Sequence, residues 1–202
     1  MNEKPRDVCE SGNDPGAFDE ADHDPAAMAF RRVCTPMVKY WVCKRAPVAV
    51  TEAMEVLGGN GYVEEGPLAL LYREAPLNSI WEGSGNVMCL DMLRAIDRAP
   101  DTLDVLFAEL RQASGADRRL DTAIAALETE FIGRADREHA ARRLAEALGV
   151  ALQASLLVRH APAAVADAFC ASRLGGQSGR AFGAMPAGVA CRAIIARATP
   201  RE

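Results

Sequence analysis

The spacing of hydrophobic residues predicts helices along most of the chain. Leu144, Leu148, Leu152 and Leu156 recur every four residues, which places them on one stripe of a helix and predicts that this stripe is buried. Alternating runs of β-branched residues are few, which argues against an all-β fold. We therefore predict an all-α helical bundle, whose C-terminal half carries helices near residues 102–113, 117–132, 136–160, 162–174 and 186–198.

The same helical spacing continues in the N-terminal half, where prolines interrupt it. Asp24 followed by Pro25 predicts a helix start, with the aspartate as N-cap and the proline in the first turn. We predict a first helix over residues 26–45, with a break or kink at Pro36. Pro47 then predicts the start of a second helix.

Glycines and prolines shape the stretch that follows. The second helix is expected over residues 48–57, because Gly58 and Gly59 are typical of a helix end. Residues 62–78 are expected to be irregular or to form a short helix, and a third helix is expected from residue 83 or 84 to about 96.

Composition and charge divide the chain into three parts. Residues 1–30 carry eight acids and two bases, so we predict a flexible acidic segment over residues 1–25. The residue composition changes at Ala99-Pro100-Asp101, after which Ala, Leu, Arg and Glu dominate. Residues 26–99 are therefore expected to form one helical domain, and residues 100–202 a helical extension packed on it. Half of the residues are hydrophobic, enough to bury a sizeable core.

The cysteines and the hydrophobic runs bear on the compartment. The six cysteines show no CxxC pair and no regular spacing, so we expect reduced thiols in a cytoplasmic protein and no metal site. No apolar run reaches the roughly 18 residues of a membrane span. The N-terminus also lacks the layout of a secretory signal.

Two glycine-containing corners are the first candidate functional features. Gly58-Gly59-Asn60-Gly61 is not a Rossmann fingerprint, because a helix rather than a strand precedes it. It is not a P-loop either, because no Lys-Ser/Thr pair follows. A helix C-cap with a turn is the favoured interpretation, and backbone N–H groups presented to a phosphate are the alternative.

The second corner, Gly83-Ser84-Gly85, follows a lone acid, Glu82. A carboxylate beside a helix start and beside the apolar Ile80 and Trp81 is placed to act as a general base. The alternative is an N-terminal capping acid without a chemical role, which is common at helix starts.

Together the two corners resemble a known family. An apolar helix, then LGGNGY, then YREAPLNSIWEGSGN and a second apolar helix resemble the C-terminal helical domain of the acyl-CoA dehydrogenases. The sequence of this stretch, with KYWVCKR before it, is most similar to the AidB-like branch, which is linked to the adaptive response to DNA alkylation. The close resemblance covers residues 28–97.

The resemblance implies a function and a set of site residues. The family oxidises the Cα–Cβ bond of an acyl-CoA thioester with FAD, and Glu82 matches the glutamate that removes the α-proton. Its backbone N–H would polarise the thioester carbonyl. Ser84 and Asn86 match positions that contact FAD. The segment of Glu55, Gly58 and Gly59 matches the part that packs on the ADP portion of FAD, often from a neighbouring subunit.

Two departures qualify that implication. Glu55 stands where many members have glutamine, and a carboxylate suits a pyrophosphate less well than an amide does. The family also places an α-helical and a β-domain before this stretch, and no run here can form that β-domain. We therefore expect a C-terminal portion that is inactive without the missing domains. Arg73 matches a family arginine, for which we expect an ion pair, for instance with Glu74 or Glu82.

Three functions stay open at this point. The first is part of a flavin-dependent acyl-CoA dehydrogenase, active with the absent domains or with a partner chain that carries them. The second is an AidB-like module that binds duplex DNA through basic residues of the tail. The third is a helical oligomerisation domain, dimeric or tetrameric, with vestigial chemistry. The candidate phosphate contacts of the second function are Arg159, Arg173, Arg180, Arg192 and Arg197.

Overall fold

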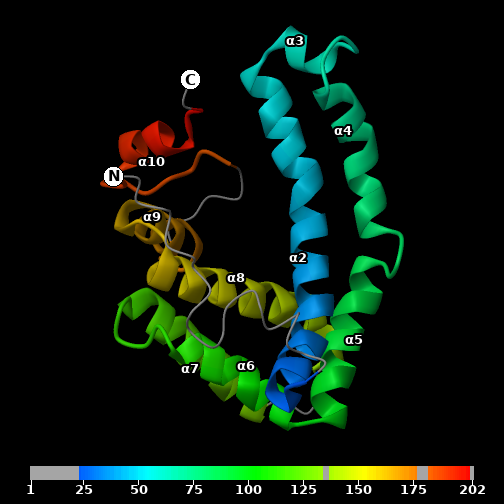
Figure 1. Ribbon diagram of the computed structural model, residues 1–202, viewed down its shortest axis with the longest axis vertical. Coiled ribbons are helices and arrows are strands. Elements are labelled where there is room, and N and C mark those ends of the chain that lie inside the picture. The colour runs from blue at the N-terminus through cyan, green and yellow to red at the C-terminus, as the bar shows by residue number, and fades with distance from the viewer. Residues whose placement is uncertain (1–22, 134–136, 177–181, 201–202) are drawn as a thin grey trace.

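The computed structural model describes residues 23–133, 137–176 and 182–200, and these residues form helices and no strand (Figure 1). The all-α prediction is confirmed. The helices, in chain order, are α2 (Pro25–Val56), α3 (Gly59–Tyr62), α4 (Leu68–Glu74), α5 (Gly85–Arg98), α6 (Asp101–Arg111), α7 (Arg118–Gly133), α8 (Ala141–His160), α9 (Ala163–Arg173) and α10 (Cys191–Ala198). Two short 3-10 helices, η1 (Ala75–Ser79) and η2 (Glu138–Ala140), lie between them. Most of the predicted acidic segment lies outside the described residues.

The start of α2 is the one predicted from the sequence. The Asp24 carboxylate accepts hydrogen bonds from the backbone N–H groups of Ala26 and Ala27, at 3.0 and 3.3 Å. These bonds satisfy two of the donors that a helix N-terminus otherwise leaves unpaired. Pro25 follows in the first turn, where its missing N–H costs nothing.

The predicted break at Pro47 is wrong, because α2 continues through both Pro36 and Pro47 as one helix of 32 residues. A proline inside a helix removes a backbone hydrogen bond and costs about 3 kcal/mol. Neighbouring elements offset that cost: α2 packs against α5, α6 and α8 along its first half and against α3, α4 and η1 along the rest. Tertiary packing therefore overrides the local preference of the two prolines.

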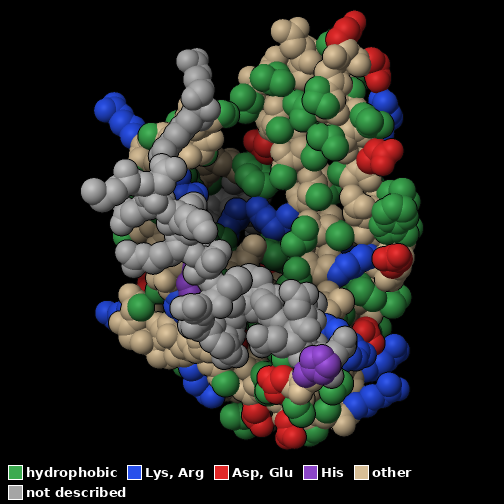
Figure 2. Space-filling view, viewed as in Figure 1, with side chains coloured by type: hydrophobic (Ala, Val, Ile, Leu, Met, Phe, Trp, Pro, Cys, Tyr) green, Lys and Arg blue, Asp and Glu red, His purple; other side chains and the backbone are tan. Residues whose placement is uncertain are grey.

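The segment after α2 folds back along it and forms an arm, which we define as residues 42–79. In Figure 1 the end of α2 rises to α3, and α4 and η1 descend beside α2 toward α5. The arm buries few side chains: Met54, Ala69 and Ala75 are its buried apolar residues. Hydrophobic side chains gather on its surface in Figure 2.

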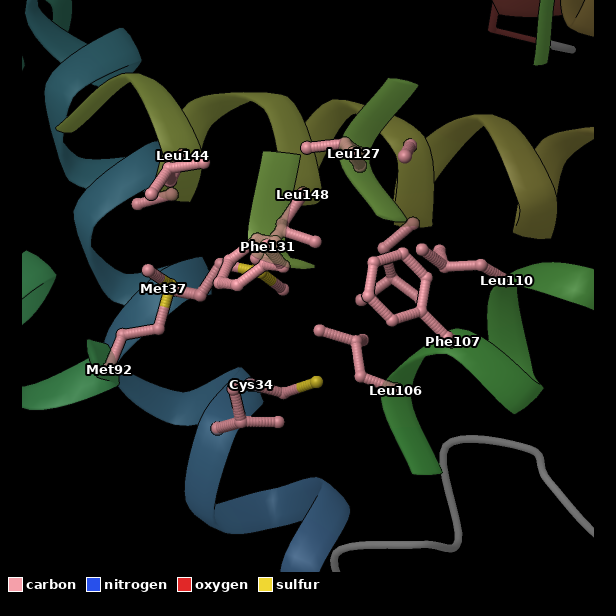
Figure 3. Packing of buried hydrophobic residues seen from close by; sticks show 14 of the residues in the cluster. Cys34, Met37, Met92, Leu106, Phe107, Leu110, Leu127, Phe131, Leu144 and Leu148 are labelled. Atoms are coloured by element: carbon pink, nitrogen blue, oxygen red, sulfur yellow. The ribbon is translucent and has the colours of Figure 1, made fainter. Parts of the chain in front are cut away.

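The rest of the molecule is a bundle, which we define as residues 25–41 of α2 together with α5 to α9. Its core side chains converge from α2, α5, α6, α7 and α8 (Figure 3). Phe107 and Phe131 meet edge to face, with ring centroids 6.2 Å apart. The other labelled core residues are Cys34, Met37, Met92, Leu106, Leu110, Leu127, Leu144 and Leu148.

Helix α8 lies at the centre of the bundle and confirms three members of the predicted leucine stripe, while the fourth, Leu156, is partly buried against the core. Leu144, Leu148 and Leu152 are buried, and α8 contacts α2, α5, α6, α7 and α9. Helix α8 packs directly on α2 at Gly149, where an added Cβ would lie 3.4 Å from the Trp41 ring, an ordinary van der Waals distance. The Trp41 indole Nε1 donates a 2.7 Å hydrogen bond to Gln153 Oε1, which pins the two helices together.

The tail helices appear close to their predicted places, but α8 and α10 begin later than predicted. Helix α8 begins at Ala141, after the 3-10 helix η2, rather than near residue 136. Helix α10 begins at Cys191 rather than near residue 186, because Gly188 adopts a φ of 91°, outside the helical range. The core cluster holds residues from both sides of the boundary predicted at residue 99, and the division into domains stays a prediction. Within the described ranges, no helix is long and apolar enough to cross a membrane.

Candidate functional site

The second glycine corner places Glu82 in an unusual backbone conformation. Among the residues that the structure describes, Glu82 is the only non-glycine residue with a positive φ, at 52°. Ser84, not Glu82, occupies the N-cap position of α5. The capping interpretation of this acid is therefore wrong, and the chain accepts backbone strain here without a helix-capping gain.

Gly83 and Gly85 are each required to be glycine by their local geometry. Gly83 has a φ of 113°, and a Cβ there would lie 2.2 Å from the Met88 Cε. A Cβ on Gly85 would lie 2.8 Å from Lys44 Cε and 3.3 Å from the Tyr40 ring. The glycines thus allow the corner to turn sharply and to lie directly against α2.

Lys39 of α2 binds the carbonyl groups on either side of the Glu82–Gly83 pair. Its ammonium donates a 2.9 Å hydrogen bond to the carbonyl oxygen of Trp81 and a second one to the carbonyl oxygen of Gly83. Within the described chain, the Glu82 N–H donates to no acceptor, so it remains available to a ligand. Sequence reasoning missed Lys39, whose only signal was a lone cation between the apolar residues of the first helix.

Glu82 and Lys39 line one groove between α2 and α5. The groove has a volume of about 530 Å³, in the range of small-molecule sites. Arg32 Nη1 and Nη2 form a fork with the two carboxylate oxygens of Asp91, both at 2.8 Å, and this fork holds the pKa of Asp91 below its usual value. The full lining is Met28, Arg31, Arg32, Thr35, Pro36, Lys39, Glu82, Met88 and Asp91.

The first glycine corner ends α2 as a C-cap with a turn. Gly58 has a φ of 58°, and its N–H donates to the Glu55 carbonyl at 3.0 Å. Gly61 lies so close to α2 that a Cβ would be 2.3 Å from the Met54 carbonyl oxygen. A Cβ on Gly58 or Gly59, in contrast, would meet no atom within 4 Å, so this backbone faces open space.

A second groove follows that corner. It has a volume of about 550 Å³, and its lining includes the exposed Glu55 carboxylate and two half-exposed or exposed tyrosines. The lining is Thr51, Met54, Glu55, Gly58, Tyr62 and Tyr72, so the two grooves share no residue. Figure 1 places α3 at the far end of the arm from the start of α5. One chain therefore does not bring Glu55, Gly58 and Gly59 together with Glu82.

The remaining residues near the second corner have partners of their own. Asn86 Oδ1 accepts a 2.7 Å hydrogen bond from Arg142 Nε of α8, which leaves its amide NH2 group as the donor to any ligand. Ser84 is exposed beside it. Arg73 forms its ion pair with Glu64, at 2.6 and 3.1 Å, and not with Glu74 or Glu82 as expected.

The tail arginines have different surroundings. Arg159 Nη1 lies 2.5 Å from Glu109 Oε1, with side chains 15% and 5% exposed, so its charge is directed into the bundle. Arg173, Arg192 and Arg197 are exposed. Arg180 lies outside the described residues.

Comparisons with known proteins agree with the corner motifs. Residues 17–96 match the family described as acyl-CoA dehydrogenase, C-terminal domain. The chain is 40% identical over 147 residues to the putative acyl-CoA dehydrogenase AidB of Escherichia coli, covering 73% of this chain and 27% of that protein. It is 31% identical over 139 residues to 3-methylmercaptopropionyl-CoA dehydrogenase of Ruegeria pomeroyi, covering 65% of this chain and 21% of that protein.

The fold has a solved counterpart. A crystal structure of Caenorhabditis elegans ACDH-11 in complex with C11-CoA superposes with a TM-score of 0.67 over 79% of this chain and 32% of that chain. The sequence identity there is 23%, so this likeness concerns the fold alone. The chain spans about a quarter of the length of the E. coli relative that it matches.

Proposed function

This chain belongs to the acyl-CoA dehydrogenase family through its C-terminal domain, and we propose that it serves as the C-terminal portion of a FAD-dependent enzyme that oxidises the Cα–Cβ bond of an acyl-CoA thioester. Glu82 is the proposed base. On this proposal the activity requires further domains, which hold the rest of the flavin and the substrate.

The observation that carries the proposal is the conformation of Glu82. An exposed carboxylate lines a groove from a strained turn that is held by two hydrogen bonds from Lys39. Strained residues persist where the surrounding structure fixes them, and they cluster at functional sites. A residue needed only to begin α5 would not require this geometry.

The chemistry assigned to Glu82 uses two of its groups. Its carboxylate accepts the α-proton of the thioester, and its unengaged N–H supports the thioester carbonyl as negative charge develops on it. FAD, when bound, supplies the acceptor for the β-hydride. The groove between α2 and α5 orients the substrate next to the base.

The residues proposed to hold FAD fit it in part. The open backbone at Gly58 and Gly59 permits close approach of a ligand, and Tyr62 and Tyr72 offer faces on which an aromatic ring can stack. Ser84 and the amide NH2 group of Asn86 lie near Glu82. The Glu55 carboxylate does not suit a pyrophosphate, so the ADP portion is held less firmly here than by an amide. Because the two grooves are separate, a complete site would draw on more than one chain or domain.

A graft tests the catalytic proposal. Residues 25–173, which carry the arm and the whole bundle, would replace the matching C-terminal segment of the R. pomeroyi 3-methylmercaptopropionyl-CoA dehydrogenase, and flavin reduction by that enzyme's substrate would be followed anaerobically. Glu82→Gln is expected to lower the rate roughly 100-fold or more while flavin stays bound. Equal rates for the two grafts, with equal flavin content, would refute the role of Glu82.

A duplex-DNA module is the second candidate function, and the exposed arginines Arg173, Arg192 and Arg197 favour it. Such residues would contact phosphates without reading bases, so binding would weaken steeply with salt. Retention of duplex DNA that is lost in the triple alanine variant would support this function. Arg159→Ala is not a suitable variant, because this arginine is paired with buried Glu109.

Self-association is the third candidate, and the surface of the arm favours it. Val56, Tyr62 and Leu57 of the arm are 84%, 75% and 56% exposed. Large apolar patches of this kind mark interaction surfaces. A dimer or tetramer that carries neither flavin nor DNA would favour this function over the other two.

A further inference from the structure

Lys39 has an unusual place for a lysine. It lies on the side of α2 that faces the second corner, one turn from the buried Pro36 and next to the buried Tyr40. Its ammonium is directed to two carbonyl oxygens, those of Trp81 and Gly83, which are 42 and 44 residues away in the sequence. Hydrogen bonds from a charged donor are stronger than neutral ones, so these two contacts fix the corner firmly.

The two carbonyl groups bracket two residues, Glu82 and Gly83: the Trp81 carbonyl belongs to the peptide before Glu82, and the Gly83 carbonyl to the peptide after Gly83. The Glu82 φ of 52° is disfavoured for any residue with a Cβ, and it persists only where neighbours hold it. Gly85 packs against Tyr40 of α2, whereas Gly83 packs against Met88 of α5, so the corner touches both helices. Those contacts position the glycines, whereas the hydrogen bonds of Lys39 fix the peptide before Glu82 and the peptide after Gly83, and so restrict the backbone of the two residues between them.

A role of Lys39 as a direct anion ligand in the groove is less consistent with this geometry. Two of its three N–H groups are already used by the carbonyls. The neighbouring Arg32 is likewise held by Asp91. Lys39 and Arg32 therefore hydrogen-bond to groups of the protein, rather than being held ready for a ligand.

We propose that Lys39 is a positioning residue, which holds Glu82 in the left-handed conformation by donating to the carbonyl oxygens of Trp81 and Gly83 and so fixes the Glu82 carboxylate in the α2–α5 groove. The catalytic consequence rests on the proposed function of Glu82 as the base. The conformational claim does not, and it can be measured on the chain alone.

The conformational test uses NMR of the isolated chain. In the unaltered chain, the HN–Hα coupling and the 13Cα shift of Glu82 are expected to show the left-handed conformation. Lys39→Met keeps most of the aliphatic stem and is expected to abolish that signature and to shift the amide signals of Glu82 and Gly83. Lys39→Arg, which keeps a charged donor, should restore part of it.

A matched control separates this effect from a simple loss of charge. Lys44 is on the same helix, and its stem touches the corner at Gly85 without bonding the carbonyls around Glu82. Lys44→Met should leave the Glu82 signals in place. A folded Lys39→Met chain with an unchanged Glu82 signature would overturn the proposal. If Lys39→Met does not fold, Lys39→Gln, whose neutral side chain is shorter, is measured in the same way. A folded Lys39→Gln chain with an unchanged Glu82 signature would overturn the proposal, and so would an unaltered chain in which Glu82 lacks the left-handed signature.

The catalytic consequence is read in the graft. Lys39→Met is expected to lower kcat roughly 100-fold with little change in KM, since a misplacement of about 1 Å can cost that much. A changed Glu82 signature with an unchanged kcat would keep the positioning claim and refute the catalytic one. If Glu82→Gln also leaves kcat unchanged, the proposed function itself fails, whatever the NMR result.

Discussion

The bundle and the arm differ in how their hydrophobic residues are used. The bundle buries its large side chains in one cluster drawn from α2 and α5 to α9, and none of that cluster comes from residues 42–79. The arm buries mainly small residues and leaves Leu70, Leu71 and Tyr72 about half exposed. Hydrophobic residues thus form a packed core in one region and an open apolar surface in the other.

The difference indicates where stability and function lie. The bundle supplies the burial on which folding depends. The arm carries Glu55, Gly58 and Gly59, and the corner with Glu82 lies where arm and bundle meet. Proposed ligand contacts therefore sit outside the core or at its edge, and the surface of the arm is suited to being covered by something else.

Truncation of a core leucine should give the largest effect. Leu148 is fully buried at the centre of α8, so Leu148→Ala is expected to lower the free energy of unfolding by about 3 kcal/mol. Leu71 on the arm is 48% exposed, and Leu71→Ala should change the free energy of unfolding by less than about 0.5 kcal/mol. Urea denaturation followed by circular dichroism measures both. Equal losses of unfolding free energy in the two variants would contradict the proposed difference in packing between bundle and arm.

Loss of one charge of the buried ion pair should come next. Glu109→Gln leaves Arg159 without its counter-charge in the bundle and is expected to cost about 2 kcal/mol. Glu64→Gln removes the partner of Arg73 on the exposed surface of the arm and should leave the denaturation midpoint unchanged. If the arm variant lost as much stability as the bundle variant, the comparison would be wrong.

The buried thiols should make the bundle sensitive to alkaline pH. Burial raises the pKa of Cys89 and of Cys170 from 9.0 to about 11, so the folded chain holds these protons after the unfolded chain has lost them. The free energy of unfolding should therefore fall as the pH rises from about 9 to 11. Cys170→Ala should flatten that slope. In native conditions at pH 8, iodoacetamide should modify the exposed Cys191 before either buried thiol. Fast modification of Cys170 would contradict the burial.

The smallest effect is expected at the rim of the α2–α5 groove. Arg32 and Asp91 are 44% and 33% exposed, so Arg32→Ala should cost less than about 1 kcal/mol despite the two hydrogen bonds. Because the pKa of Asp91 is lowered by this pair, the contribution is present above the ordinary carboxyl range and is lost in acid. A double-mutant cycle with Asp91→Ala, at two salt concentrations, measures the coupling. A coupling energy above about 2 kcal/mol between Arg32 and Asp91 would contradict this expectation, because it would show that the pair stabilises the fold as strongly as a buried contact does.

Local sequence predicted those features that depend on neighbouring residues. The Asp24 cap and the stripe through Leu144 and Leu148 follow from short-range spacing, and both are confirmed. The break at Pro47 was wrong, since packing against the arm and the bundle outweighs the cost of a proline inside a helix.

The contacts of the site could not be predicted in the same way. The sequence identified Glu82 and its corner, but Lys39 reaches that corner across more than 40 residues, and Arg142 reaches Asn86 across 56. Such pairs form only once the helices pack. The strain at Glu82 is likewise a property of the folded corner, because glutamate has no local preference for a positive φ.

The most direct measurement is the flavin content of the purified chain. A folded bundle with an incomplete flavin site should unfold cooperatively and yet retain well below one FAD per chain after dialysis, judged from flavin absorbance. One tightly held FAD per chain would contradict the account, because the separate grooves of the arm and the corner would then be sufficient for the cofactor.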